Sequence, residues 1–380
     1  MEKNRIALLC HRKGNIGHLF MAIGVKNILK DTFKENIEIN YFEQHNPFEV
    51  YPKNHWLRYI NFLPHGKFKK IREALNKDSF KNKSFPSLSP LKYKLAIACG
   101  GPNIVKGAYN APEMGLMLQH LNAAFKHRKV PLLDIGVGSC FPLEKKPKKF
   151  IDQKDRIFYS KSFDLITKIS VRDKTAKNLV NELGFNCELI PCAAIASGRS
   201  FQRESSNIPN HEKYIAINFQ RDGSNSSWGQ GIDSNSWLQT MRDVISRLEI
   251  DHKIILLAHS KYELKLARRL APHLRRVQPK NSYEYSDLIS RVKLGLVSRI
   301  HAAIPLAGIG VPSIVIGTDT RIETIDMLGL PNSFVKKVNA QWLLEKTNIL
   351  LNQLEEEKDR LIEIRESTIK QYSEIIKSTI

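Results

Sequence analysis

The sequence has 380 residues, of which 42% are hydrophobic, and a formal net charge of +21 at pH 7. Such a length exceeds the size at which a single hydrophobic core keeps growing, so we expect two domains. No apolar run reaches the roughly 18 residues of a membrane-spanning helix, and the apolar segment at residues 4–12 is too short for a secretory signal. We therefore expect a cytoplasmic protein.

The basic charge restricts the partners that we expect. Lysines are dense at residues 67–83 and 145–149, but no nucleic-acid-binding motif accompanies them, so a nucleic acid partner is not indicated. An anionic polymer, an acidic small molecule or the inner face of a membrane would suit this surface. A merely solvated surface is an equally good interpretation. The oligomeric state stays open.

The five cysteines and twelve histidines indicate neither disulfides nor a metal site. The cysteines are odd in number, show no C-x-x-C spacing and lie in apolar segments such as "AIACGG". This usage is typical of buried free thiols in a reducing compartment. Because the histidines form no cluster with metal-ligand spacing, we expect no metal.

Short apolar segments alternate with turns and amphipathic helices from residue 4 onward. This repeated order of strand, turn and helix predicts a parallel sheet with helices on both faces. We expect strands within 4–10, 37–42, 93–103 and 130–139, helices within 11–30 and 113–129, a strand and a helix within 163–185, and a final apolar segment at 187–197.

A polar stretch at residues 198–213, "GRSFQRESSNIPNHEK", interrupts the pattern, and we place the domain boundary there. The predicted domains are therefore 1–197 and 214–340, followed by a helical segment at 341–380. In the second domain we expect strands at 214–220, 253–260, 275–279, 294–298 and 312–317, and helices at 235–249, 261–271, 282–291 and from about 300. Two doubly wound domains would leave a cleft between the carboxyl ends of their strands.

Three glycine turns follow strands of the first domain: "GNIGH" at 14–18, "CGGPN" at 99–103 and "GVGSCFP" at 136–142. Together they predict a floor of backbone atoms that would fit a flat or anionic ligand. A dinucleotide site is poorly supported, because the first turn lacks the G-x-G-x-x-G spacing. Simple tight turns are the alternative interpretation.

Residues 297–317, "VSRIHAAIPLAGIGVPSIVIG", place Arg299 and His301 between apolar stretches. Ser298 is the expected N-cap of the helix that follows. A cation in the first turn opposes the helix macrodipole, and an anionic ligand on the same amides would explain its presence. The alternative is that Arg299 pairs with a carboxylate of the other domain and His301 is a hydrogen-bonded core histidine.

Two further sets of residues have open roles. In "SVRD", residues 170–173, Arg172 and Asp173 favour a neighbouring pair that caps the next helix, although Arg172 would otherwise supply a cation at the cleft. Trp228 and Trp237 are candidates for stacking on a sugar ring, or for packing in the core or over a loop.

Taken together, these segments resemble the polysaccharide pyruvyl transferase family. The segment "SRIHAAIPLAGIGVPSIVI" is similar to the R-x-H segment of that family, and "GNIGH" resembles its G-N-x-G-D turn. "CGGPN", "VPLLDIGVGSCFP" and "ISVRDKTAKNLVNELG" resemble its G-G-G strand end, its G-x-G-x-x-P stretch and its R-D helix start. His18 stands where the family usually has Asp, and "IPCAAIAS" replaces its usual Pro-Asp-Pro, which leaves the acceptor sugar open.

The resemblance implies an α/β fold of the GT-B-like type, in which two doubly wound Rossmann-like domains face each other across a cleft. It implies transfer of the pyruvyl group of phosphoenolpyruvate onto two hydroxyls of a sugar in a surface or exopolysaccharide precursor, with a cyclic ketal and phosphate as products. Phosphoenolpyruvate would be the donor substrate, and no cofactor is expected. A lipid-linked saccharide acceptor would bring the protein to the inner face of the membrane.

The resemblance also implies roles for individual residues. His301 would be the acid/base group, since an imidazole can deliver and take up protons near neutral pH, and Arg299 would clamp the donor. Arg221, Ser298 and His259 would complete the donor side, with Gln220 as the alternative to Arg221 and a structural role as the alternative for His259. The residues expected on the acceptor side are Asn15, Gly17, His18, Gly100, Gly101 and Gly138.

Two other functions remain open from the sequence. A GT-B-type glycosyltransferase that uses a sugar nucleotide would need a carboxylate for the ribose and a cradle for the diphosphate, and the fold alone does not exclude it. A non-catalytic protein that binds a polyanion or a membrane would show steep salt dependence and release no phosphate. The pair of Arg299 and His301 favours a compact, highly charged donor.

Overall fold

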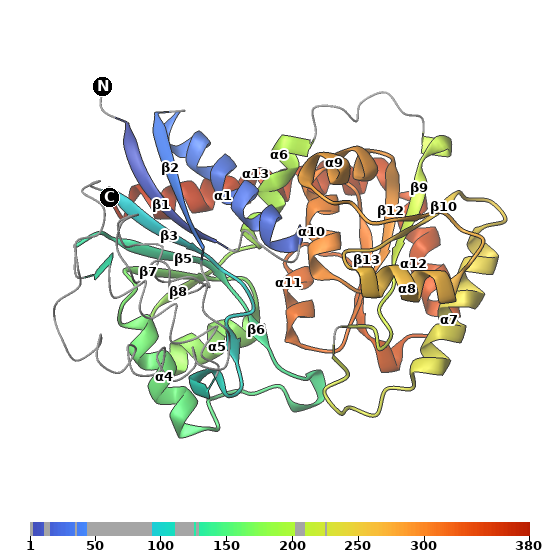
Figure 1. Cartoon of the computed structure of the whole chain (residues 1–380), viewed down its shortest axis with the longest axis horizontal. Coiled ribbons are helices and arrows are strands. Elements are labelled where there is room, and N and C mark those ends of the chain that lie inside the picture. Colours follow the sequence, from blue (N-terminus) through green and yellow to red (C-terminus); the bar gives the residue numbers. More distant parts are fainter. Residues whose placement is uncertain are drawn as a thin grey trace, which may run out of the picture.

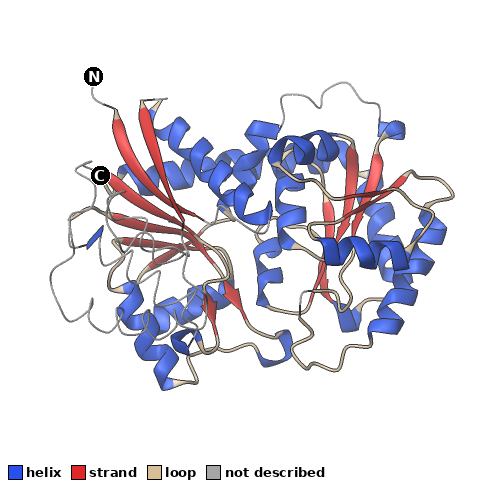
Figure 2. Ribbon diagram, in the orientation of Figure 1, coloured by secondary structure: helices blue, strands red, loops and turns tan. Residues whose placement is uncertain are grey.

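The computed structural model describes residues 3–10, 16–34, 36–43, 93–110, 125–126, 129–201, 210–224 and 226–380. Within these ranges the chain forms two α/β domains, each built on a parallel sheet, that lie side by side (Figure 1, Figure 2). Asn15, the lysine-rich segment at 67–83 and most of the predicted helix at 113–129 lie outside the described residues.

The first domain contains a six-stranded sheet in the order β2-β1-β3-β5-β7-β8, with every neighbouring pair parallel. Strands β3 and β5 are buried along their whole length, which explains why β3 is an unbroken apolar run and why Asp134 is the only charged residue in β5. The strands are β1 (Asn4–Cys10), β2 (Ile37–Glu43), β3 (Leu95–Cys99), β5 (Leu132–Val137), β7 (Lys168–Val171) and β8 (Cys187–Leu189), and a separate pair is formed by β4 (Ile104–Val105) and β6 (Ser139–Cys140).

Helices cover both faces of this first sheet. They include α1 (Ile16–Phe33), α4 (Gln153–Phe163) and α5 (Lys174–Glu182). The sequence pattern does not predict α4, because its buried aromatic face consists of only Tyr159 and Phe163, one turn apart. Its N-cap, Asp152, accepts a hydrogen bond from the backbone N–H of Lys154 at 2.8 Å, which supports the start of the helix.

The second domain repeats this plan with a parallel sheet in the order β11-β10-β9-β12-β13-β14. Three of its helices begin at the side-chain caps Asp233, Ser260 and Asn281. The strands are β9 (Tyr214–Asn218), β10 (Ile254–Leu257), β11 (Arg276–Val277), β12 (Val292–Val297), β13 (Ser313–Gly317) and β14 (Asn332–Phe334); the helices are α7 (Ser234–Leu248), α8 (Lys261–Leu270), α9 (Ser282–Ser290), α10 (Ile300–Gly308), α11 (Glu323–Asp326) and α12 (Ala340–Asn352).

The last helix, α13 (Leu354–Lys377), returns to the first domain. In Figure 1 it runs behind α1, and the hydroxyl of Thr32 donates to Ser373 Oγ at 2.9 Å. Tyr372, which is fully buried, donates from its hydroxyl to the carbonyl of Pro191 at 3.1 Å. The segment predicted as one helical tail at 341–380 is therefore two helices, of which α12 packs on the second domain and α13 on the first.

The helix α6 (Gly198–Phe201) occupies the first residues of the stretch that we predicted as a linker. A Cβ on Gly198 would lie 1.9 Å from the carbonyl oxygen of Gly308, so α6 and α10 touch through their backbones. Arg199 forms an ion pair with Asp31 of α1 at 3.0 Å. The polar composition of this stretch therefore reflects interdomain contacts as well as a connection.

Hydrogen bonds join the two domains on the side where the strands of both sheets end. The hydroxyls of Ser139 and Thr320 form a hydrogen bond at 2.7 Å, and the N–H of Thr320 donates to the carbonyl of Phe141 at 2.8 Å. The N–H of Thr175 donates to Glu323 Oε2 at 2.9 Å. These contacts hold the carboxyl ends of the two sheets against each other, where parallel α/β sheets usually bind ligands.

Among the described helices, none has the length and apolar character to cross a membrane.

Candidate active site

A cavity of about 180 Å³ lies between the two domains at these carboxyl ends. His18, Pro102 and Arg172 line it from the first domain. The polar residues that line it from the second domain are Gln220, Ser224, Ser298, Arg299, His301, Thr318, Asp319 and Arg321. The cavity therefore combines three guanidinium groups and two imidazoles in a small space.

His301, on the first turn of α10, is held in place by the helix α1 of the other domain. A Cβ added to Gly17 would lie 2.6 Å from His301 Nδ1, so only glycine leaves room for the ring. His301 Nε2 lies 3.5 Å from Arg172 Nη1, and the ring of His18 is 6.4 Å away between centroids. Burial lowers the pKa of His301 well below 6.5, and the charges of Arg172 and other neighbours lower it further. The imidazole is therefore neutral at pH 7 in this state.

Arg172, directly after β7, is 1% exposed although its side chain borders the cavity. Its Nη1 donates to Cys192 Sγ at 3.4 Å, while its Nε has no hydrogen-bond partner among the described residues. No carboxylate in those ranges forms an ion pair with it. The neighbouring Asp173 is engaged as the N-cap of α5, accepting from the N–H of Ala176 at 2.7 Å, and accepts from the hydroxyl of Ser139 at 2.7 Å.

The structure confirms that Asp173 caps the next helix, and the charge of the neighbouring Arg172 acts on its carboxylate. The two side chains form no ion pair, and Arg172 lines the cavity. A buried cation without a carboxylate is costly unless an anion compensates it. Arg172 is therefore the residue that marks the cavity as an anion site.

Arg299 lies directly before α10 and not within its first turn, where the sequence predicts it. It is itself the N-cap of α10, and its side chain forms no capping hydrogen bond. The predicted cap, Ser298, lies one residue earlier, and its buried Oγ has no hydrogen-bond partner within the described ranges. The guanidinium of Arg299 pairs with Glu263 of α8, so the carboxylate comes from the same domain, not from the other one.

Glu263 links Arg299 to the buried end of β9. Its Oε2 accepts hydrogen bonds from Asn218 Nδ2 and from the N–H of His259, both at 2.9 Å. Burial alone would raise the pKa of Glu263, but the charge and hydrogen bond of Arg299, together with the N–H of His259, outweigh it and the pKa is lowered. Glu263 therefore stays ionised and fixes the position of the Arg299 side chain.

Arg321 and Asp319 form a second ion pair in the cavity wall, at 2.6 Å between Nη2 and Oδ2. Burial would raise the pKa of Asp319, but the hydrogen bonds and charge of Arg321, together with the hydrogen bond from Trp228, lower it overall. Trp228 Nε1 also donates to Asp319 Oδ2 at 3.3 Å, and Ser224 Oγ accepts from Arg321 Nη2 at 3.1 Å. Sequence reasoning missed this pair, although "TDTR" follows directly after the strand end at Gly317, where ligand-binding side chains gather.

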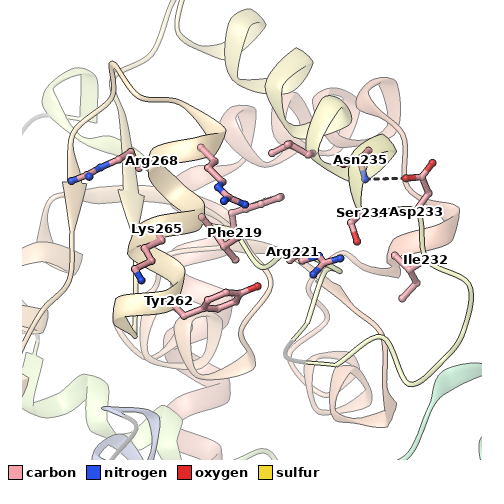
Figure 3. A pocket seen from close by; sticks show the side chains of 12 residues that line it. Phe219, Arg221, Ile232, Asp233, Ser234, Asn235, Tyr262, Lys265 and Arg268 are labelled. Atoms are coloured by element: carbon pink, nitrogen blue, oxygen red, sulfur yellow. Dashed lines mark hydrogen bonds between the residues drawn. The ribbon is translucent and has the colours of Figure 1, made fainter.

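Arg221, predicted on the donor side, does not line this cavity. Its side chain is 66% exposed, lies 3.7 Å from Asp222 and faces a separate groove on the other side of α8 (Figure 3). Gln220, the alternative, lines the cavity instead. The structure therefore separates Arg221 from His301, and the additional guanidinium groups beside His301 are those of Arg172 and Arg321.

His259 lies behind the cavity wall. It is 8% exposed, and its ring packs against Tyr285 in a T-shaped contact at 5.6 Å between centroids. Neither of its ring nitrogens has a hydrogen-bond partner among the described residues, and burial lowers its pKa to about 4. These features match the structural alternative for His259.

The residues expected on the acceptor side that the structure describes, which are all of them except Asn15, divide into two groups. Gly17 and His18 contact or face His301. Gly100, Gly101 and Gly138 support the chain nearby: a Cβ on Gly100 would lie 2.3 Å from the carbonyl oxygen of Gly136, and the N–H of Gly138 donates to the Gly101 carbonyl at 2.7 Å. These three are absent from the cavity lining.

The two tryptophans have different places. Trp237 is 4% exposed, stacks on Phe219 at 6.0 Å and donates from Nε1 to the Gln220 carbonyl at 3.0 Å, so it is a core residue. Trp228 is 41% exposed and has a φ of 56°, in the left-handed region that side chains rarely adopt. Its bond to Asp319 fixes the indole beside the cavity.

No group of His, Cys, Asp and Glu in the described part of the chain has an arrangement that could hold a metal ion. The charged and titratable side chains that line the cavity are those of its arginines and histidines and of Asp319. Its polar groups can bind a small anion, and His301 can exchange a proton beside it.

Comparisons with solved structures show the fold, and a comparison with family profiles shows the family. Similar solved structures include the UDP-GlcNAc 2-epimerases of Neisseria meningitidis, bound to UDP-GlcNAc (11% identity, 99% of both chains, TM-score 0.52), and Methanocaldococcus jannaschii (15% identity, 92% of this chain and 93% of that chain, TM-score 0.52). At these identities the likeness shows the two-domain GT-B-type fold alone. No curated protein sequence matches the chain. The sequence profile described as polysaccharide pyruvyl transferase matches residues 15–320. The chain therefore belongs to the polysaccharide pyruvyl transferase family and is a transferase enzyme.

Proposed function

We propose that the protein transfers the pyruvyl group of phosphoenolpyruvate to two hydroxyls of a saccharide, forming a cyclic ketal and releasing phosphate. The observation that carries this proposal is the buried guanidinium of Arg172, which forms no ion pair within the described residues, has an Nε without a hydrogen-bond partner there, and lies 3.5 Å from His301. An anionic donor bound there would satisfy the guanidinium and reach the imidazole at the same time.

The size of the cavity supports a compact donor. A space of about 180 Å³ suits a three-carbon phosphate ester, whereas a sugar nucleotide would have to extend far beyond it. Two of the three arginines are already paired, Arg299 with Glu263 and Arg321 with Asp319. These pairs hold two guanidinium forks rigidly for the phosphate and the carboxylate, and Arg172 supplies the uncompensated charge.

His301 can act as an acid only after the donor has bound. Its pKa is low while burial and the charge of Arg172 act on it, and a nearby trianion would raise that pKa. Binding of the donor would thus favour protonation of His301, the residue that then donates a proton to it. Protonated His301 then delivers a proton to the methylene carbon of the enol, which becomes a methyl group.

The remaining steps balance in atoms and charge. The first sugar hydroxyl forms a bond to the central carbon and gives its proton to the now neutral His301. The bond from this carbon to the phosphate oxygen breaks, and phosphate leaves with the electron pair. The second hydroxyl closes the ketal ring and its proton passes to the phosphate. Fixed guanidinium groups stabilise the charge that develops on the leaving phosphate.

Trp228 supports the saccharide side of the proposal. Its indole is exposed beside the cavity, and it keeps a strained left-handed backbone while bonded to Asp319. Strain of this kind is concentrated at functional sites. A flat, exposed indole can stack on the apolar face of a sugar ring, so we assign Trp228 to the positioning of the acceptor.

The test is a transfer assay with phosphoenolpyruvate and a panel of oligosaccharides that carry neighbouring free hydroxyls. We expect one oligosaccharide to gain the mass of pyruvate less one water, with one phosphate released, and His301→Gln to lose both products. Transfer of a hexose from a UDP-sugar, with no product from phosphoenolpyruvate, would replace the proposal with the glycosyltransferase alternative.

A further inference from the structure

A second and larger depression lies on the outer side of α8, away from His301. It has a volume of about 960 Å³ and is bordered by the end of β9, the start of α7 and the length of α8 (Figure 3). It is therefore about five times as large as the cavity of about 180 Å³ between the domains. We call it the α7–α8 groove.

Basic side chains are concentrated in this groove. Lys265, Arg268 and Arg269 line it from α8, and Arg221 lines it from the loop after β9. Arg221 has a carboxylate neighbour, Asp222, at 3.7 Å, whereas none of the other three forms an ion pair with a described residue. The groove therefore carries positive charge that the described chain leaves largely uncompensated.

The nearest carboxylates are already engaged with the backbone and side chains of α7. Asp233 lines the groove, but its Oδ1 accepts from the N–H groups of Asn235 at 2.9 Å and of Ser236 at 3.1 Å. Asp222 Oδ1 accepts from the hydroxyl of Ser234. These bonds hold the acidic groups at the helix end, so the cations of α8 remain available to an external anion.

The floor of the groove is apolar and aromatic. Phe219, Ile232, Leu238 and Leu266 line it between the charged residues. The ring of Tyr262, 58% exposed, extends into the same space (Figure 3). A ligand that carries phosphate on an apolar or aromatic body would match both parts of this surface, whereas a free small anion would use only the cations.

The groove and the catalytic cavity share two walls. Phe219 and Arg221 face the groove, while Gln220 between them faces the cavity. On α8, Glu263 is directed to Arg299 in the cavity, and Lys265 is directed to the groove. A ligand in the groove is therefore adjacent to the catalytic cavity without occupying it.

We propose that the α7–α8 groove binds a diphosphate group carried on an apolar or aromatic body. Lys265, Arg269 and Arg221 bind the phosphate oxygens, and Tyr262 with the apolar floor holds the attached group. Two sources share this chemistry, a prenyl diphosphate and a nucleoside diphosphate. The proposal does not depend on the donor reaction, because binding in the groove requires none of the cavity residues.

The test measures binding of inorganic pyrophosphate by calorimetry at low salt, in the absence of phosphoenolpyruvate. We expect Arg269→Glu to weaken this binding by about tenfold or more, and Arg269→Gln to weaken it less. The matched control is Lys370→Glu, which makes the same charge change on the exposed face of α13 and should leave the affinity unchanged. Near-UV circular dichroism confirms that each variant is folded.

Binding of uridine diphosphate and of farnesyl diphosphate then distinguishes a nucleoside diphosphate from a prenyl diphosphate. The compound whose attached group fits the apolar floor of the groove should bind more tightly than pyrophosphate does. Absence of pyrophosphate binding overturns the proposal, and so does equal affinity in the wild type and Arg269→Glu. If Arg172→Ala loses pyrophosphate binding and Arg269→Glu keeps it, the anion binds in the catalytic cavity, and this result would also overturn the proposal. Arg269→Glu should keep its affinity for phosphoenolpyruvate, so a failure of the donor proposal is seen separately.

Discussion

The guanidinium of Arg172 and the imidazole of His301 come from different domains, 129 residues apart in the chain, and lie 3.5 Å from each other. Arg172 is fully buried and lowers the pKa of His301, so the two groups repel each other when both are charged. An anion between or beside them would reverse this relationship, because it would attract both charges.

Removing the positive charge of Arg172 should separate its two effects. We expect Arg172→Gln to weaken phosphoenolpyruvate binding by about two orders of magnitude, because it removes a buried charged hydrogen-bond donor. The pKa of His301 in the free protein should rise at the same time, as one source of its depression is lost. NMR titration of the His301 ring measures the second effect, and an unchanged pKa would show that Arg172 does not act on His301.

Donor binding should take up a proton near neutral pH. The free protein holds His301 neutral because burial and Arg172 lower its pKa, and the bound trianion raises that pKa, so a proton enters between the two values. Calorimetry in buffers of different ionisation enthalpy measures the uptake directly. His301→Gln should bind without it, and equal uptake by the variant would assign the proton to another group.

Gly17→Ala should damage activity through His301 and not through the helix that carries it. A Cβ at Gly17 would lie 2.6 Å from His301 Nδ1, whereas alanine is the better residue in a helix by roughly 1 kcal/mol. We expect about a hundredfold loss of turnover, at the upper end of what displacement of an acid/base group by about 1 Å causes. On a His301→Ala background the same substitution should cost no further activity, and a second loss there would contradict the steric account.

Trp228 should lower the stability of the fold and strengthen binding of the acceptor. Its φ of 56° is strained for a tryptophan or an alanine but not for glycine. The free energy of unfolding of Trp228→Gly should therefore exceed that of Trp228→Ala by about 1 kcal/mol. Both variants should raise the KM for the saccharide while the affinity for phosphoenolpyruvate stays unchanged. Denaturant unfolding and steady-state kinetics test the two parts, and a loss of donor affinity would remove Trp228 from the acceptor side.

Acid should destabilise the protein through His259. Its pKa is 6.5 in an unfolded chain and about 4 in the folded one, since burial disfavours the charged ring. Between these values the unfolded state binds more protons, so the free energy of unfolding falls as pH falls from 6.5 towards 4, by up to about 3 kcal/mol. His259→Phe keeps an aromatic contact with Tyr285 and should flatten this slope; an unaltered slope would locate the effect elsewhere.

Much of the fold follows from local patterns in the sequence. The strands predicted at 4–10 and 312–317 are rich in apolar residues and adjoin turns, and the structure confirms them as β1 (Asn4–Cys10) and β13 (Ser313–Gly317). The pattern fails where an element has few apolar residues. The helix α4 presents only two buried aromatic residues to the first sheet, and the contacts of α6 are made through a glycine and an ion pair.

The candidate site was predictable where chemistry conflicts with local preference. Arg299 and His301 stand out because charged groups occupy an apolar segment, and the structure places both in one cavity. The sequence favours a capping role at residues 172–173 over a cation in the cleft, because Asp173 is a good helix cap and explains the local pattern without a ligand. That Arg172 meets His301 depends on how the two domains pack, and that Arg221 lines the groove beside α7 and α8 depends on the course of the loop after β9. No local pattern encodes either.

The most direct test of this account is calorimetric binding of phosphoenolpyruvate, without acceptor, to the wild type, Arg172→Gln and Arg299→Ala, with Arg221→Ala as the matched control outside the cavity. The account predicts binding by the wild type, retention in Arg221→Ala, and a loss in both cavity variants. No binding by the folded wild type, or a loss only in Arg221→Ala, would contradict the assignment of this cavity as the donor site.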